Sequence, residues 1–292
     1  MLISSKINHG GKRMSTLEQT SFITLQDLKL SYSEAGKGEP ILCLHGNPSS
    51  KSVFSNMMTK LDNLNIKLVA LDRPGHNATD EIPNEKNDLW YDAFIYSDFI
   101  KAKLNKKAWI LGHSYGCLTA LKIAIKYPER VKGLIFINPL VAPATPNESL
   151  SSIPHFSKGF LTGSIIGLWL PFEYPKVLSD LLNKFFQPEK PADEYAELWI
   201  QRFIRFENVV AYQTDRNIQI NIQDELKEEM KKLSLPTFAL YGAKDAYTDI
   251  GRQQEVVNLI PGVKSETNES TGHYMPYVNP ELCLDFIKKS IF

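Results

Sequence analysis

Short apolar runs and longer stretches with helical spacing alternate along the first half of the chain. The apolar runs are rich in Ile, Leu and Val, and they predict β-strands at 28–34, 41–44, 66–71, 108–111 and 131–137. Apolar residues that recur at helical spacing predict helices at 53–61, 88–104 and 117–127. Strands that alternate with helices in this way are typical of a parallel sheet covered by helices on both faces.

This alternation stops after about residue 142 and resumes near residue 235. The intervening part has a Pro- and Ser-rich stretch, then an apolar segment at 159–172, then helical patterns at 177–186 and 195–206. A strand, a helix, a second strand and a closing helix then follow at 235–241, 250–259, 263–268 and from Pro280. We therefore expect an α/β core domain formed by 21–141 and 233–292, with a helical cap domain, 142–232, inserted after the sixth strand. Residues 1–20 are expected to be a flexible tail.

The amino-acid composition is ordinary for a folded domain and argues against several classes of function. The 292 residues are 43% hydrophobic and 23% charged, and 33 basic residues balance 33 acidic ones, whereas a nucleic-acid-binding protein normally carries a basic excess. The three cysteines lack the spacing of a zinc or redox site, so we expect buried thiols. No apolar run is long enough to span a membrane, and the first residues lack a secretory pattern. A soluble, cytoplasmic protein is expected.

The sequence Gly112-His113-Ser114-Tyr115-Gly116 has the form G-x-S-x-G. It directly follows a predicted strand and precedes a predicted helix, which is the setting of a nucleophile elbow. The glycines permit a sharp, strained turn that presents the serine hydroxyl at the end of the sheet. The helix that follows directs its positive end toward charge developing there. Ser114 is therefore the predicted nucleophile, the alternative being a strand-to-helix turn with a capping serine.

A serine nucleophile needs a base, and the base needs an acid to orient it. His273 follows the last predicted strand, and Asp245 follows the strand before it, so both are expected at the same sheet edge as Ser114. Asp249 is the nearest competitor for the acid, but it is expected to cap the next helix. His45, His76 and His113 lie in turns, which favours local structural roles. The strand before the cap ends at Asn138 rather than at an acid.

An oxyanion hole requires two backbone N–H groups that face the developing negative charge. Tyr115, the residue after the nucleophile, is expected to supply one of them. The second is expected from Asn47 in the turn His45-Gly46-Asn47-Pro48, which follows the third strand. Read alone, this turn is also compatible with a plain β-turn.

With these motifs in place, the chain resembles an α/β-hydrolase-fold enzyme with a cap domain. The likeness runs from about Leu28 to Phe292 and rests on five stretches: LCLHGNP, LDRPGH, LGHSYG, YGAKDAY and GHYMPYVNP. The resemblance implies a catalytic triad of Ser114, Asp245 and His273 and oxyanion donors at Asn47 and Tyr115. It implies no metal and no organic cofactor. HGNPSS also resembles the oxyanion loop of haloalkane dehalogenases, but those enzymes and epoxide hydrolases use an aspartate nucleophile.

These features predict a serine hydrolase that cleaves a carboxylester or lactone bond of a hydrophobic small molecule. The alternatives are a C–C bond hydrolase of a diketone-like acid and a ligand-binding protein that keeps the scaffold. The C–C hydrolase requires a cationic site under the cap, for which Arg202 and Arg205 are weak candidates. The apolar residues 159–172 are interpreted as packing between cap and core, with a substrate pocket or a membrane-surface contact as alternatives. Either a monomer or a homodimer fits the sequence.

Overall fold

The computed structural model describes residues 20–83, 88–142, 174–203 and 206–292. Its centre is an eight-stranded sheet with the order β1-β2-β4-β3-β5-β6-β7-β8, in which the pairs β1–β2 and β2–β4 are antiparallel and all others are parallel. The strands are β1 (Ser21–Leu25), β2 (Leu28–Gly36), β3 (Glu39–Leu44), β4 (Ile66–Leu71), β5 (Ala108–His113), β6 (Val131–Ile137), β7 (Thr237–Gly242) and β8 (Lys264–Asn268). The mostly parallel sheet predicted from the sequence is confirmed.

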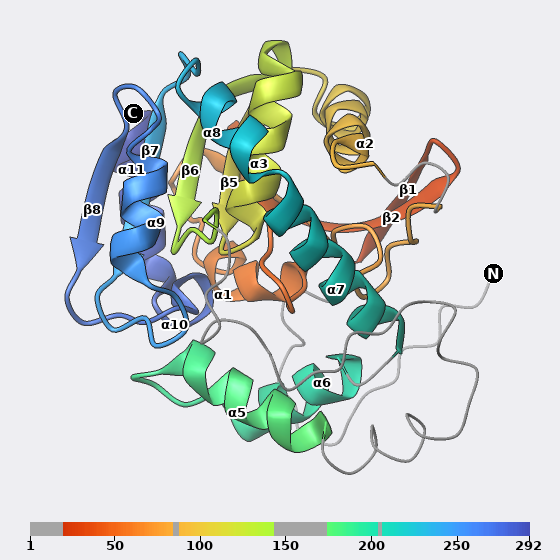
Figure 1. The fold of residues 1–292 in the computed structure, drawn as a ribbon, viewed down its shortest axis with the longest axis vertical. Helices are drawn as coiled ribbons and strands as arrows, with labels where there is room; N and C mark the ends of the chain where they lie inside the picture. The colour runs from red at the N-terminus through yellow and green to blue at the C-terminus, as the bar shows by residue number, and fades with distance from the viewer. Residues whose placement is uncertain (1–19, 84–87, 143–173, 204–205) are drawn as a thin grey trace.

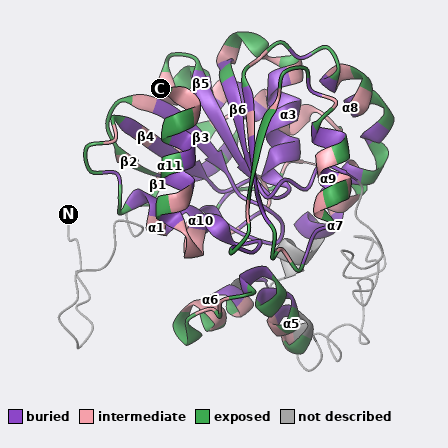
Figure 2. Cartoon of the chain, turned by 90° about the vertical axis from the view of Figure 1, so that its left-hand side faces the viewer, coloured by how far each residue is buried: buried purple, intermediate pink, exposed green. Residues whose placement is uncertain are grey.

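Helices cover both faces of the sheet and create two apolar cores (Figure 2). One face packs against α2 (Tyr91–Phe99), α3 (Gly116–Lys126), α8 (Gln223–Met230) and α9 (Ile250–Val257). The other face packs against η2 (Lys51–Phe54), α1 (Ser55–Met58) and α11 (Pro280–Ile291). The central strands β3 and β5 are buried along nearly their whole length, which explains why they appear in the sequence as continuous apolar runs.

The described residues between β6 and β7 form four helices: α5 (Tyr174–Phe186), α6 (Asp193–Phe203), α7 (Phe206–Asn221) and α8. Figure 1 shows α5 and α6 beyond the end of the sheet toward which the β6 arrow points, while α7 runs from them back toward α3. The short helix α10 (Met275–Val278) follows β8 and lies at that same end. All four helices between β6 and β7 lie in the range predicted for the cap, 142–232, but α8 packs with α3 on one face of the sheet, and residues 187–192 between α5 and α6 are not helical.

Most predicted elements are present, and the exceptions have physical reasons. The strands at 66–71 and 131–137 have the predicted bounds, and the three cysteines are buried and unpaired, as expected. The edge strand β1 was not predicted, because its apolar residues do not alternate with polar ones: Phe22 is exposed whereas Ser21 is partly buried. The helices α7 and α8 were not predicted either, because polar residues dominate their sequences. The predicted apolar segment 159–172 and Arg205 lie outside the described residues, as does the side chain of Arg202.

Candidate active site

Ser114 lies in the sharp turn between β5 and α3, and its backbone adopts the left-handed conformation, with φ of 55°. An L-residue other than glycine, Asn or Asp rarely adopts this conformation, so the turn is strained. The turn leaves no space for a side chain at the neighbouring glycines. A Cβ on Gly116 would lie 2.0 Å from the Leu44 carbonyl oxygen, and a Cβ on Gly46 would lie 2.7 Å from the Ser114 Cβ. The Ser114 N–H donates to the Ile137 carbonyl at 3.1 Å, which ties the turn to β6.

The three residues predicted as a triad lie in one hydrogen-bonded row. The His273 Nε2 is 3.0 Å from the Ser114 Oγ, and the His273 Nδ1 is 2.6 Å from the Asp245 Oδ2. The side chains of His273 and Asp245 are 1% and 0% exposed. The row joins loops that follow β5, β7 and β8, because the carboxyl ends of these parallel strands share one edge of the sheet. This geometry fits proton transfer from the serine hydroxyl to the imidazole.

Asp245 is held so that one oxygen faces His273. Its Oδ1 accepts hydrogen bonds from the backbone N–H groups of Tyr247 and Thr248 at 2.8 and 2.9 Å, and the Thr248 hydroxyl donates to Oδ2 at 2.8 Å. Burial by itself raises the pKa of this carboxyl, but the His273 imidazole and the Thr248 hydrogen bonds outweigh burial and hold the pKa below its ordinary value. Asp249 instead accepts a hydrogen bond from the Arg252 N–H and caps α9, as expected.

Two side chains from neighbouring strands hold the backbone of the His273 loop. The Asn138 side-chain amide donates to the Gly272 and His273 carbonyls at 2.7 and 2.9 Å, and its oxygen accepts from the Gly242 N–H at 2.7 Å. The His113 Nε2 lies 2.8 Å from the His273 carbonyl oxygen. Burial, followed by the nearby His273, lowers the pKa of His113 to about 3, so its ring is neutral. His113 ends β5, and its partner His273 lies 160 positions further along the chain, so the expectation of a local role in a turn is wrong.

Aromatic rings enclose the His273 imidazole on the side of the inter-strand helices. Phe185 of α5 stacks on it with ring centroids 5.3 Å apart and an interplanar angle of 28°, and the Tyr247 ring lies 5.0 Å away. The Tyr274 N–H donates to the Phe185 carbonyl at 3.0 Å, and its ring stacks on Phe185. A residue of the predicted cap thus contacts the predicted base directly and covers it with apolar surface.

Asn47 and Tyr115, the predicted oxyanion donors, line one small pocket. Within the described part of the chain, the backbone N–H of neither residue donates to a backbone carbonyl. Neither N–H is therefore occupied by a backbone acceptor, as an oxyanion donor requires. Tyr115 directly precedes α3, so the positive end of that helix adds to the attraction for negative charge.

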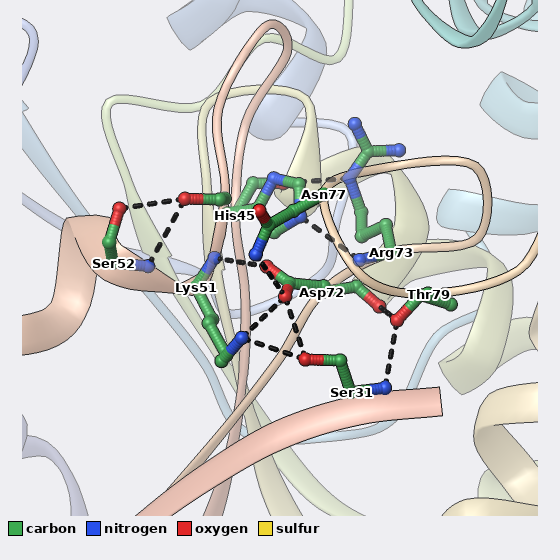
Figure 3. A network of polar contacts seen from close by, with 9 residues as sticks. Ser31, His45, Lys51, Ser52, Asp72, Arg73, Asn77 and Thr79 are labelled. Carbon is green, nitrogen blue, oxygen red and sulfur yellow. Dashed lines mark hydrogen bonds and ion pairs between the residues drawn. The ribbon is translucent and has the colours of Figure 1, made fainter. Parts of the chain in front are cut away.

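The loop that carries Asn47 continues into a buried ion pair (Figure 3). The Lys51 Nζ lies 2.5 Å from the Asp72 Oδ2, and the backbone N–H of Lys51 donates to the Asp72 Oδ1 at 2.8 Å. The Ser31 hydroxyl and the Asn77 amide also donate to this carboxylate. Asp72 thus accepts four hydrogen bonds, one at Oδ1 and three at Oδ2, which compensates for the burial of its charge. The network fastens the end of the Asn47 loop to the carboxyl end of β4.

A second buried network joins the same loop to α7. Arg73 donates to the His45 and Gly46 carbonyls at 2.9 and 3.1 Å, and its guanidinium forms a 2.7 Å ion pair with Asp215. The His76 Nε2 lies 3.2 Å from the Asn47 Oδ1 and 3.4 Å from the Asp215 carboxylate. His76 is therefore not a purely local turn residue. Through Arg73 and His76, a carboxylate of an inter-strand helix is coupled to the loop of a predicted oxyanion donor.

The pocket itself has two walls. Asn47, Tyr115, Leu140 and Tyr247 come from the core, and the α7 residues that line it are Tyr212, Arg216 and Gln219. Sequence reasoning missed Asp215 and Arg216 because they belong to no motif. The available signal was the spacing of Tyr212, Asp215, Arg216 and Gln219, which places the four on one face of a helix.

The described residues hold no cluster of His, Cys, Asp and Glu that would bind a metal ion. None of the helices in the described ranges has the length and apolar character that a membrane crossing requires.

Comparisons with known proteins agree with the fold described above. Residues 39–280 match the family described as alpha/beta hydrolase fold. The chain is 30% identical to a 2-hydroxy-6-oxo-6-phenylhexa-2,4-dienoate hydrolase of Comamonas testosteroni over 118 residues, which are 39% of this chain and 41% of that protein. It is 25% identical over 281 residues to a 2-(acetamidomethylene)succinate hydrolase of Mesorhizobium japonicum, covering 90% and 92% of the two chains. A thermophilic esterase from Thermogutta terrifontis superposes with a TM-score of 0.70 at 19% identity, covering 93% and 97%.

Proposed function

We propose that this chain, which belongs to the α/β-hydrolase fold family, is a serine hydrolase that cleaves a carboxylester or lactone bond of a largely hydrophobic small molecule. The observation that carries the proposal is the row Ser114–His273–Asp245, with distances of 3.0 and 2.6 Å, beginning at a strained elbow. This arrangement supplies a nucleophile, a base and an orienting acid without further movement.

In the proposed reaction the Ser114 Oγ attacks the acyl carbon while the His273 Nε2 takes its proton. The N–H groups of Asn47 and Tyr115 stabilise the oxyanion of the tetrahedral intermediate. His273 then protonates the leaving alcohol, which leaves an acyl group on Ser114. Water attacks this acyl-enzyme with His273 as base, and the serine is restored. Asp245 holds the imidazole in the required tautomer and stabilises the imidazolium.

Residues 142–232 act in this proposal as a cap that limits the entry of water. Phe185 of α5 already stacks on the His273 ring, and α7 forms one wall of the pocket. A low-polarity enclosure strengthens each electrostatic contact to the transition state.

A second candidate, the C–C bond hydrolase, uses the same serine and histidine. Two observations favour keeping it. The Comamonas and Mesorhizobium relatives are named for a dienoate and a succinate derivative, both of which bear carboxylates. A cationic side chain, Arg216, lines the pocket, as this reaction class requires.

Steady-state turnover of three substrate sets tests the proposal: p-nitrophenyl esters of graded chain length, alkyl lactones, and a diketone-like acid. We expect ester or lactone hydrolysis to have the highest kcat/KM. Turnover confined to the diketone-like acid would replace it with the C–C reaction. Saturable binding without turnover would favour a ligand-binding protein on this scaffold.

A further inference from the structure

One face of α7 is built into the site. Tyr212, Asp215, Arg216 and Gln219 follow the spacing i, i+3, i+4, i+7, and Tyr212, Asp215 and Gln219 are buried, whereas Asn217 on another face is exposed. The Tyr212 carbonyl accepts a hydrogen bond from the Asn47 side chain at 3.2 Å, and the Gln219 amide donates to the Ala142 carbonyl at 2.6 Å. These contacts on both sides of Arg216 fix the position of α7 relative to the pocket that Arg216 lines.

The charge of Arg216 is not neutralised by the residues described around it. Its Nε is buried and has no hydrogen-bond partner among those residues. The adjacent carboxylate, Asp215, is directed to Arg73, with which it forms the 2.7 Å pair. Among the described residues that line the pocket none is acidic, and Arg216 alone is charged. Because an unpaired buried N–H is costly, this donor is placed for a ligand rather than for the fold.

We infer that Arg216 binds a carboxylate of the substrate, so that the hydrolase proposed above acts on a carboxylate-bearing acyl compound rather than on a neutral one. The inference rests on the proposed function. A guanidinium presents its N–H groups in a planar fork that matches the two oxygens of a carboxylate. Arg216 lines the same pocket as Asn47 and Tyr115, so one molecule can direct its reacting carbonyl to their N–H groups and its carboxylate to Arg216.

With Arg216 as the carboxylate site, the other described pocket residues are left to contact the rest of the substrate. Leu140, Tyr212 and Tyr247 offer mainly apolar surface to the carbon chain of the substrate. Gln219 is a poor competitor for the carboxylate because its amide already donates to the Ala142 carbonyl. The bound anion satisfies the guanidinium, so a neutral isostere of the same shape leaves Arg216 without its partner and binds more weakly.

The test compares a charged and a neutral substrate of equal length: mono-p-nitrophenyl glutarate and p-nitrophenyl pentanoate. Arg216→Gln removes the charge, Arg216→Lys keeps the charge without the fork, and Arg252→Gln removes an arginine of α9 that does not line the pocket. We expect Arg216→Gln to lower kcat/KM for the glutarate about 30-fold or more, to leave the pentanoate within about 3-fold, and to be partly rescued by Arg216→Lys. Equal effects on both substrates, or none on either, would overturn the inference.

A binding measurement separates this result from the proposed function. In Ser114→Ala protein, calorimetry should give a dissociation constant for 5-phenylpentanoate about 10-fold lower than for 5-phenylpentanamide, and adding Arg216→Gln should abolish that difference. If no ester is turned over but the difference is present, the hydrolase proposal fails and the carboxylate site stands. If esters are turned over and the two ligands bind alike, the carboxylate site fails and the hydrolase proposal stands.

Discussion

The sheet edge that carries the candidate active site and the inner face of α7 both contribute residues to one pocket, but their residues are positioned in different ways. At the sheet edge, Ser114, Asp245 and His273 follow strands directly, and their positions are fixed by short loops and buried backbone hydrogen bonds. On α7, Arg216 lines the pocket and Asp215 pairs with Arg73, because the helix packs against the loops that follow the strands. The residues at the sheet edge belong to short motifs that can be recognised in the sequence. The residues on α7 are brought to the site by tertiary packing, which no local motif indicates.

This difference decided what could be predicted. Ser114 is marked by its glycines and by its place between a strand and a helix, and the chain order of Asp245 and His273 follows from the strand order. The structure brings these three side chains into contact, and it places Asn47 and Tyr115 in one pocket. Arg73 and His76 belong to the recognised stretch LDRPGH, but their partner Asp215 lies 142 and 139 positions further along the chain and has no motif of its own. Only the packing of α7 shows that they act together.

The largest expected effect lies on the sheet edge. Asp245→Asn should reduce kcat about 10³- to 10⁴-fold, because an amide cannot hold the imidazole in the tautomer that accepts the Ser114 proton. Steady-state kinetics on a p-nitrophenyl ester measures it. Asp249→Ala is the matched control: it should leave kcat within about 3-fold and cost about 1 kcal/mol of stability, because Asp249 caps α9. If Asp249→Ala inactivates the enzyme instead, the acid has been assigned wrongly.

The next effect tests the close fit at the elbow. Gly46→Ala places a Cβ 2.7 Å from the Ser114 Cβ and 3.2 Å from its Oγ, so the serine or the Asn47 loop must shift. We expect kcat to fall about 100-fold, because small displacements of reacting groups carry penalties of this order. Gly251→Ala, whose Cβ would meet its nearest atom at 3.6 Å, is the control, with kcat unchanged. Equal kcat values for the two variants would show that the loop adapts freely.

A smaller effect is expected from the α7 side. Asp215→Asn removes the charge that pairs with buried Arg73, so the protein should lose about 3 kcal/mol of stability and about 10-fold in kcat as the Asn47 loop loosens. Chemical denaturation and kinetics measure the two quantities. Glu225→Gln is the control, since its pair with Lys126 is half exposed at 3.4 Å and should contribute less than about 1 kcal/mol. A variant as stable and active as the parent protein would show that α7 does not support the loop.

The smallest effect concerns pH and reports on the buried histidines. Burial, followed by Arg73, lowers the pKa of His76 to about 4, and burial lowers that of His113 to about 3. The unfolded chain binds protons near pH 6.5 and the folded one does not, so stability should fall by about 2 kcal/mol per histidine between pH 7 and pH 5. Urea unfolding of parent protein and His113→Gln should show a shallower pH dependence for the variant. Parallel curves would contradict the assignment of a neutral His113.

The central claim is that Ser114 is an activated nucleophile, and covalent labelling tests it most directly. The protein is incubated with a fluorophosphonate probe, its intact mass is measured, and the modified peptide is sequenced, with Ser114→Ala treated in parallel. We predict a single adduct on Ser114 in the parent protein and none in the variant. An adduct that persists in the Ser114→Ala protein, or folded parent protein that takes up no probe, would contradict the account.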